Sequence, residues 1–214
     1  MAETRRGLTY SPENIAENGI RVLRSSNIDG DTFVYGNEDV FVDENAVNIP
    51  YVKSGDILIT SANGSSRLVG KHAIIKDLPM KSAVHGGFML AASSEKPEFV
   101  NALMGAPWYA SFINLFVAGG NGAIGNLSKS DLDDQVVYVP ESKEQDAIGS
   151  FFEKLDNLIT LHQRKLKNTS VFFIFSQNSP TAQNKKPQPI EISMDCGDVC
   201  TIPIRLLRSS SSDP

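Results

Sequence analysis

The sequence predicts an α+β protein in which a strand-rich domain is followed by one long helix and a disordered tail. Three observations predict this class. Short apolar runs between Gly-, Ser- and Asn-rich turns fill the first 140 residues, and apolar residues then recur with a helical period. After Gln177 the chain becomes rich in Asn, Gln, Lys, Pro and Ser, which is typical of disorder. We therefore expect domains at 1–140, 141–177 and 178–214.

The first domain combines several short strands with two short helices. The apolar runs that predict strands lie at 33–35, 40–42, 56–60, 70–75 and 136–139. The first two runs flank a Gly36-Asn37 turn, the last is stopped by Pro140, and the stretch from Ser61 to Arg67 is expected to be an exposed polar loop. The helices are expected at 97–104 and 108–117, the second being ended by Gly119-Gly120.

The long helix is predicted from Ser142, which has the spacing of a capping box with Gln145. Seam positions then recur at steps of four and three, a period that packs against another long helix. They are Ile148, Phe152, Leu155, Ile159, His162 and Leu166. The helix could instead fold back on its own domain. Because that domain offers no second heptad helix, we expect an intermolecular partner.

Composition excludes several classes of protein. No apolar run approaches the roughly 18 to 20 residues that a membrane span needs, and the N-terminus does not resemble a signal peptide, so we expect a cytoplasmic protein without a membrane partner. Cys196 and Cys200 are too few for a disulfide framework or a four-thiolate zinc site. The net charge of −5 argues against a polyanionic partner, although residues 57–94 carry four cations against Asp77 alone.

A glycine motif raises the possibility of a small nucleotide-dependent enzyme. Residues 120–125, GNGAIG, match the dinucleotide pattern G-x-G-x-x-G, but the segment before them is predicted to be a helix, where such a site needs a strand. His72, His85 and His162 lie in no nucleophile or metal motif. We therefore expect a protein that is not an enzyme and that binds neither cofactor nor metal.

Six segments resemble, in order, half of a type I restriction-modification specificity subunit. They are IRVLRSSNI, KSGDILIT, VGKHAII, GGFML, SKSDLDDQVVYVP and SKEQDAIGSFFEKLDNLITLHQRKL. The resemblance covers roughly residues 7–167, and the last segment is similar to the spacer helix that follows each target recognition domain in that family. The resemblance implies that the chain recognises a bipartite double-stranded DNA target without catalysing a reaction. It would do so on behalf of separate methyltransferase and restriction subunits.

The chain departs from the family pattern in three ways. A complete member carries two recognition domains and two helices, whereas this chain has one of each. Residues 5–10 resemble the interior of a recognition domain, and the sequence beyond Leu166 differs from the family's helix end. We therefore expect a truncated half-subunit that forms a homodimer or pairs with another half-subunit. The alternative is a noncatalytic protein-interaction module that oligomerises through its helix.

Two segments, 61–67 and 119–129, are expected to face DNA. Side chains that match base edges are Asn63, Ser65, Ser66 and Arg67, and Arg is the commonest reader of guanine. Lys71 and Lys129 are expected to hold phosphates. Asn121 and Asn126 supply neutral polar groups in the second segment, which holds no acid.

Overall fold

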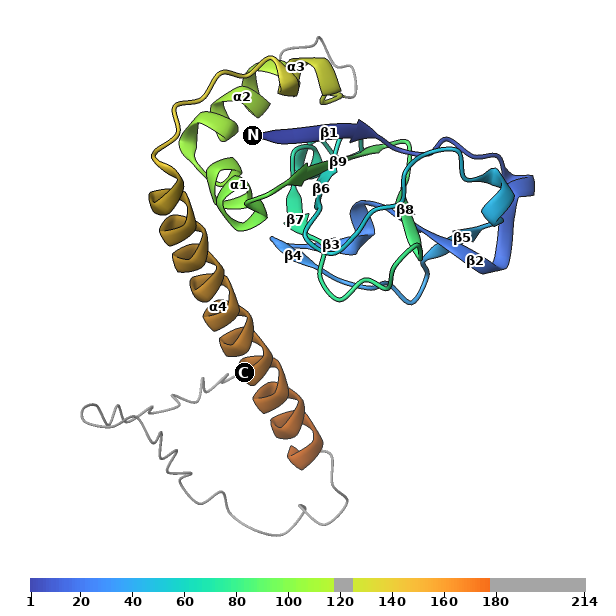
Figure 1. Ribbon diagram of the computed structural model, residues 1–214. Helices are drawn as coiled ribbons and strands as arrows, with labels where there is room; N and C mark the ends of the chain where they lie inside the picture. Colours follow the sequence, from blue (N-terminus) through green and yellow to red (C-terminus); the bar gives the residue numbers. More distant parts are fainter. Residues whose placement is uncertain (118–124, 178–214) are drawn as a thin grey trace, which may run out of the picture. The chain divides into compact units, whose positions relative to one another are not determined.

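The computed structural model describes residues 1–117 and 125–177. In the C-terminal helix α4 (Ser142–Gln177) it describes the side chains up to Gln163 and those of Lys165 and Leu166. The chain divides into two compact units, Met1–Gln163 and Arg164–Pro214. All strands and the first three helices belong to the first unit, together with the first part of α4 (Figure 1). The α+β class is confirmed.

A four-stranded antiparallel sheet forms the centre of the first unit. Its strands, in spatial order, are β1 (Ala2–Arg6), β9 (Met89–Ser94), β6 (Ile57–Thr60) and β7 (His72–Ile74). In the central strand β6 all four residues are buried, because apolar clusters cover both faces of the sheet. The predicted runs at 56–60 and 70–75 are therefore confirmed as neighbouring strands.

A second sheet has three strands, β5 (Val40–Val42), β2 (Ile15–Leu23) and β8 (Ala83–His85). The strands β2 and β8 are parallel, whereas β2 and β5 are antiparallel. The short strands β3 (Ile28–Asp29) and β4 (Thr32–Phe33) pair only with each other.

The strands on either side of the Gly36-Asn37 turn are therefore not paired with each other as a hairpin. The carboxylate of Asp39 accepts hydrogen bonds from the amide nitrogen of Gly36 and from the Asn27 side chain, and it forms an ion pair with Arg21. These contacts direct β5 toward β2, where Val42 is completely buried.

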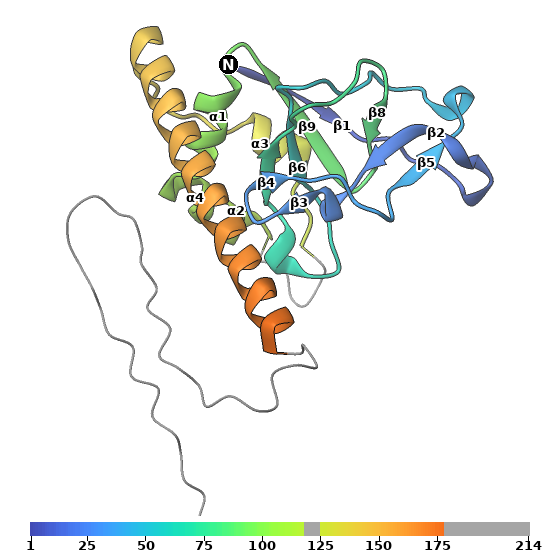
Figure 2. The same cartoon turned by 90° about the horizontal axis from the view of Figure 1, so that it is seen from below.

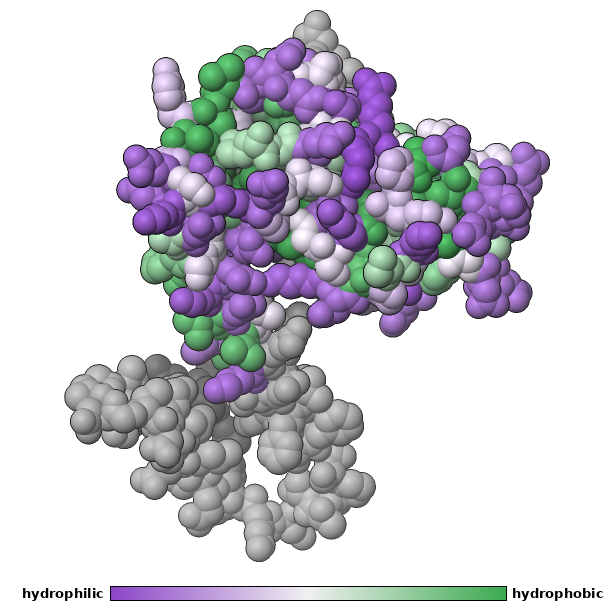
Figure 3. All heavy atoms as spheres, in the orientation of Figure 1, coloured by the Kyte–Doolittle hydropathy of each residue, from purple (hydrophilic) through white to green (hydrophobic). Residues whose placement is uncertain are grey.

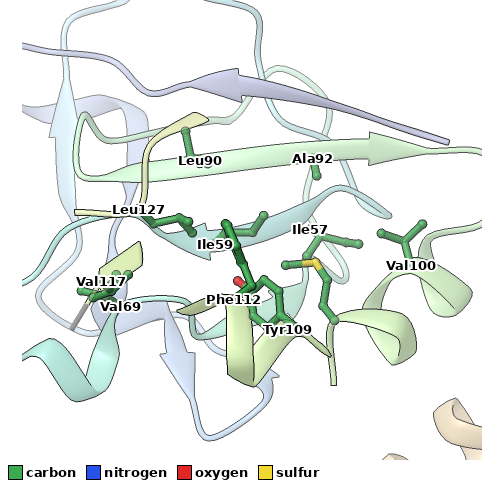
Figure 4. Packing of buried hydrophobic residues seen from close by; sticks show 11 residues of the cluster. Ile57, Ile59, Val69, Leu90, Ala92, Val100, Tyr109, Phe112, Val117 and Leu127 are labelled. Atoms are coloured by element: carbon green, nitrogen blue, oxygen red, sulfur yellow. The ribbon is translucent and has the colours of Figure 1, made fainter. Parts of the chain in front are cut away.

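Two helices cover one face of the four-stranded sheet, as Figures 1 and 2 show. They are α1 (Pro97–Met104) and α2 (Pro107–Val117), close to the predicted ranges. Tyr109 and Phe112 of α2 pack toward Ile57 and Ile59 of β6 (Figure 4). The Tyr109 hydroxyl also donates a 2.9 Å hydrogen bond to the carbonyl of Gly70, so the buried phenol is paired.

The closing strand predicted at 136–139 is wrong. After the short helix α3 (Lys129–Asp133), the chain from 135 to 140 belongs to no strand or helix. Val136 is 91% exposed and Tyr138 fully exposed, so the β-forming residue types find no neighbouring strand within the described parts of the chain. Strand propensity without a cross-strand partner does not make a strand.

Helix α4 (Ser142–Gln177) begins at the predicted residue but without the predicted capping box. The Gln145 side chain donates a 2.9 Å hydrogen bond to the carbonyl of Pro140. The Ser142 hydroxyl is contacted at 2.6 Å by the ammonium group of Lys96, which also forms a 2.7 Å ion pair with Asp146. Contacts with the preceding domain, rather than a local box, thus stabilise this end of the helix.

One face of α4 does pack on its own domain. Gly149 is buried, and a Cβ atom there would lie 2.8 Å from the amide nitrogen of Phe99, too close to be accommodated. The seam lies largely in solvent: Ile148 and Leu155 are 36% and 37% exposed, and the other described apolar seam residues are more exposed. Green apolar side chains accordingly interrupt the hydrophilic surface along this helix in Figure 3. Within the described part of the chain, no helix is long and apolar enough to cross a membrane.

Candidate nucleic-acid interface

A cleft of about 770 Å³ lies where loops of the first unit meet. Besides the β2 residue Ile15, its walls come from the β1–β2 connection, the start of the β6–β7 loop, the turn between β8 and β9, and the residue Asn126, and a fifth segment directly after β2 adds Arg24 and Ser25. The backbones of Gly7 and Gly86 lie close together in this region, because a Cβ atom on Gly7 would be 1.9 Å from the carbonyl oxygen of Gly86. Leu8, which follows, donates its amide hydrogen to the carbonyl of His85 at 2.7 Å.

The two segments expected to face DNA are joined at this cleft. The backbone of Ser61 and Leu127 is linked by a 2.8 Å hydrogen bond, and the Ser61 hydroxyl donates to the Leu127 carbonyl at 2.8 Å. Ala62 and Asn126 form an isolated antiparallel bridge. The predicted polar loop therefore begins beside the end of the glycine-rich segment.

Asn63 is the predicted site residue most firmly held in the cleft. Its side-chain amide donates a 2.9 Å hydrogen bond to the Ser25 hydroxyl, and its carbonyl oxygen accepts from the amide nitrogen of Ser65 at 2.9 Å. Ser65, Ser66 and Arg67 are exposed, and their side chains make no hydrogen bond or ion pair within the described residues. They are therefore available to a ligand, whereas Asn63 is already positioned by the fold.

The two predicted phosphate contacts differ in environment. Lys71 is half-buried where β7 begins. Lys129 is not isolated, because its ammonium group forms an ion pair with Asp133 one helical turn later. Partial desolvation raises the pKa of the Asp133 carboxyl, but hydrogen bonds from Lys129 and Thr4 outweigh it and lower the pKa overall. The Asp133 carboxylate offsets part of the positive charge that Lys129 would present to a phosphate. Asn126 is exposed, and Asn121 lies outside the described residues.

Two cleft residues escaped the sequence analysis. Arg24 follows β2, and its guanidinium donates a 3.0 Å hydrogen bond to the carbonyl of Glu38, while its buried Nε has no partner within the described structure. Phe88 lies on the turn after β8 with 74% of its surface exposed. Phe88 could have been found from the sequence, because it is an aromatic residue directly after the Gly86-Gly87 pair. No local feature of the sequence distinguishes Arg24, which lines the cleft, from Arg21.

The electrostatic character of the cleft differs from that of the whole chain. The chain carries 25 acidic against 20 basic residues, yet among the described residues no Asp or Glu lines this cleft, and Arg24 is the one charged residue of its described lining. Neutral hydrogen-bonding side chains supply the other polar groups, among them Thr9, Ser25 and Asn63. A polyanion can therefore approach the cleft without facing a carboxylate in its lining.

The described residues offer neither a metal site nor a dinucleotide site. No group of three or more His, Cys, Asp or Glu side chains among them could hold a metal ion. The segment before the glycine motif is the helix α2, as predicted, so the strand that a dinucleotide site requires is not there. His85 is fully buried, and burial lowers its pKa to about 4, while burial also lowers the pKa of His72. The His85 imidazole belongs to the packed interior, whereas His72 is half-buried at the start of β7.

Comparison with known proteins agrees with this architecture. The family model "Type I restriction modification DNA specificity domain" matches residues 2–169. The StySPI specificity subunit, a type I restriction enzyme subunit of Salmonella potsdam, is 30% identical over 162 residues, which are 72% of this chain and 33% of that protein. The chain thus spans about a third of the length of this curated relative.

Two solved structures are similar. One, from work on complex assembly and conformational transition of the type I R-M system, has a TM-score of 0.52 at 12% identity and covers 79% of this chain and 40% of that one. The HsdS subunit of Thermoanaerobacter tengcongensis has a TM-score of 0.45 at 13% identity, covering 88% of this chain and 52% of that chain. The first similarity establishes a shared fold.

The fold and the family match together define a DNA specificity domain. The chain belongs to the family of type I restriction modification DNA specificity domains. The family resemblance stated from the sequence is therefore confirmed, with a single such domain matched over most of the chain.

Proposed function

We propose that this chain binds double-stranded DNA in a sequence-specific manner through the cleft and its two bordering loops. The observation that carries the proposal is the hydrogen-bonded junction of Ser61 with Leu127, which brings the loop of Asn63, Ser65, Ser66 and Arg67 beside Asn126. Base edges are read by such donors and acceptors, while Lys71 and Lys129 would contact phosphates. Residues 1–140 would act as the recognition domain and 141–177 as a spacer.

The chain would recognise DNA on behalf of other proteins. Because its relatives are named specificity subunits of type I restriction enzymes, we place it in the cytoplasm with a methyltransferase subunit and a restriction subunit. A single recognition domain would read one half of a bipartite target. The other half would be read by a second copy or by another half-subunit.

The exposed seam of α4 supports this pairing. Burying a large apolar side chain is worth about 1.5 to 3 kcal/mol, and Phe152, Ile159 and Leu166 are between 45% and 67% exposed. A second copy in antiparallel orientation would cover these residues and form a closed twofold dimer. Such a dimer would read two inverted copies of one half-site at a fixed spacing.

The test is selection of bound duplexes from a random library, with and without the methyltransferase subunit. Enrichment of two inverted copies of one half-site at a fixed spacing supports the proposal. A logarithm of affinity that falls linearly with the logarithm of salt concentration indicates phosphate contacts. Suppose that neither sample enriches a motif and that the chain instead binds a protein with an affinity that does not depend on salt. That result would favour an interaction module that oligomerises through α4.

A further inference from the structure

We propose that Phe88 is a specificity-determining residue that contacts the 5-methyl group of a thymine in the major groove. This inference rests on the DNA-binding function proposed above and names a residue outside both loops expected to face DNA. Its support comes from three properties of the described structure. They are the hydrogen-bonded backbone that carries the side chain, its exposure in the lining of the cleft, and the chemistry of its neighbours.

The backbone at Phe88 is held on both sides. The amide nitrogen of Met89 donates to the carbonyl of Gly86 at 2.8 Å, which closes the turn, and Gly86 donates in turn to Leu23 of β2 at 2.9 Å. The carbonyl of Phe88 accepts two hydrogen bonds, from Ser61 at 2.9 Å and Ala62 at 3.0 Å. The turn that carries Phe88 is therefore fixed to the start of the polar loop, and a fixed contact loses little conformational entropy on binding.

The side chain itself takes no part in the core. Phe88 is 74% exposed, although the next residue, Met89, is 1% exposed and packs in a core cluster. Single exposed apolar residues are ordinary on protein surfaces. Phe88 is the most exposed of the large apolar residues in the described lining of the cleft, where Ile15 is 53% exposed, and the same lining contains Asn63.

The neighbours of Phe88 suit bases better than phosphates. Phosphate contacts are dominated by Lys and Arg, whereas the cleft holds one Arg among neutral polar and apolar side chains. A base edge in the major groove presents donors, acceptors and, on thymine alone among the four bases, a methyl group. Polar groups such as Asn63 match the donors and acceptors, and Phe88 matches the methyl group.

The experiment uses the full chain and the duplex enriched from the random library. Each thymine of the enriched half-site is replaced in turn by deoxyuridine, which removes only the methyl group, and binding of wild type and Phe88→Ala is measured. We expect one position at which deoxyuridine weakens wild-type binding several-fold but leaves Phe88→Ala unchanged. Phe88→Ala should bind the thymine duplex about tenfold more weakly, with an unaltered salt slope because no charge is removed.

The control is Tyr138→Ala, which removes a fully exposed aromatic side chain that does not line the cleft. It should bind like wild type at every position. Thermal unfolding of Phe88→Ala at the wild-type temperature would show that the fold persists, and Phe88→Leu, which keeps an apolar group, should restore part of the affinity.

Two failures are distinguishable. If wild type enriches a motif but deoxyuridine affects wild type and Phe88→Ala equally at every thymine, or if the motif contains no thymine, Phe88 does not have this role and DNA binding stands. If wild type enriches nothing, the DNA-binding function fails and the role of Phe88 fails with it.

Discussion

At the residue scale, the buried polar groups belong to the framework. Asp56 is completely buried at the start of β6, where its carboxylate forms a 2.7 Å ion pair with Arg5 and accepts a 2.7 Å hydrogen bond from the Ser93 hydroxyl. The Lys53 amide nitrogen donates to the same carboxylate at 3.1 Å. Asp56 thus joins β1, β6 and β9, which explains the acidic residue inside the motif KSGDILIT.

His85 should make stability depend on pH. Because burial lowers its pKa from 6.5 to about 4, the unfolded chain binds the proton more tightly than the folded chain. The free energy of unfolding should therefore fall as the pH is lowered from about 6.5 toward 4, by at most about 3 kcal/mol. Urea unfolding at several pH values would measure this.

The matched variant is His85→Gln, whose amide can still donate a hydrogen bond to the carbonyl of Arg5. It should lose much of the pH dependence in that window, whereas His162→Gln, at an exposed position, should retain it. An unchanged pH dependence in His85→Gln would contradict the assignment.

Arg67 and Lys129 should differ in their effect on DNA binding. The guanidinium of Arg67 is exposed and without an ion pair in the described structure, so Arg67→Ala should weaken specific binding by about 1 to 3 kcal/mol and relax the preference at one base position. Lys129→Ala should weaken binding to all sequences alike. Competition binding against a panel of altered duplexes measures both, and equal shifts across the panel for both variants would refute the distinction.

At the element scale, α4 has two different faces. Gly149 and the ion pairs Lys96–Asp146 and Lys76–Glu153 attach the helix to its own domain. Phe152 and Ile159, by contrast, are 45% and 55% exposed. A helix that served only to cover its own core would bury its apolar stripe instead.

Replacing Leu155 and Ile159 together with Glu should convert a dimer to a monomer. The two carboxylates would face an apolar interface in the dimer but mainly water in the monomer, since the residues that they replace are 37% and 55% exposed. Sedimentation velocity measures the change, and circular dichroism checks that the recognition domain stays folded. Wild type that sediments as a monomer at micromolar concentration would leave another half-subunit or the methyltransferase as the partner of α4.

At the scale of the whole molecule, the chain should depend on other subunits for any reaction. The purified chain should neither methylate nor cleave DNA, with or without S-adenosylmethionine or ATP, because family membership assigns it to specificity domains. Methyl transfer and cleavage assays on the purified chain measure this. Turnover that persists through repeated purification and co-elutes with the chain would contradict the expectation.

Local sequence patterns were enough to predict the fold class, the helices α1 and α2, the start of α4, the strands β6 and β7, and the resemblance to the family. These features depend on local periodicity and on short motifs, which need no knowledge of distant neighbours. The same local reasoning predicted a strand at 136–139 and a capping box at Ser142. Both were wrong because strand pairing and contacts such as Lys96 with Ser142 are made between distant parts of the chain.

The composition of the cleft depends on contacts between distant parts of the chain. Ser61 and Leu127 are 66 positions apart, and Asn63 and Ser25 are 38 positions apart, yet hydrogen bonds join each pair. Nothing local separates Arg24 from Arg21, although one lines the cleft and the other pairs with Asp39. The physical reason is that a binding surface is assembled from loops whose proximity follows from the order of strands in a sheet, and that order is set by long-range pairing.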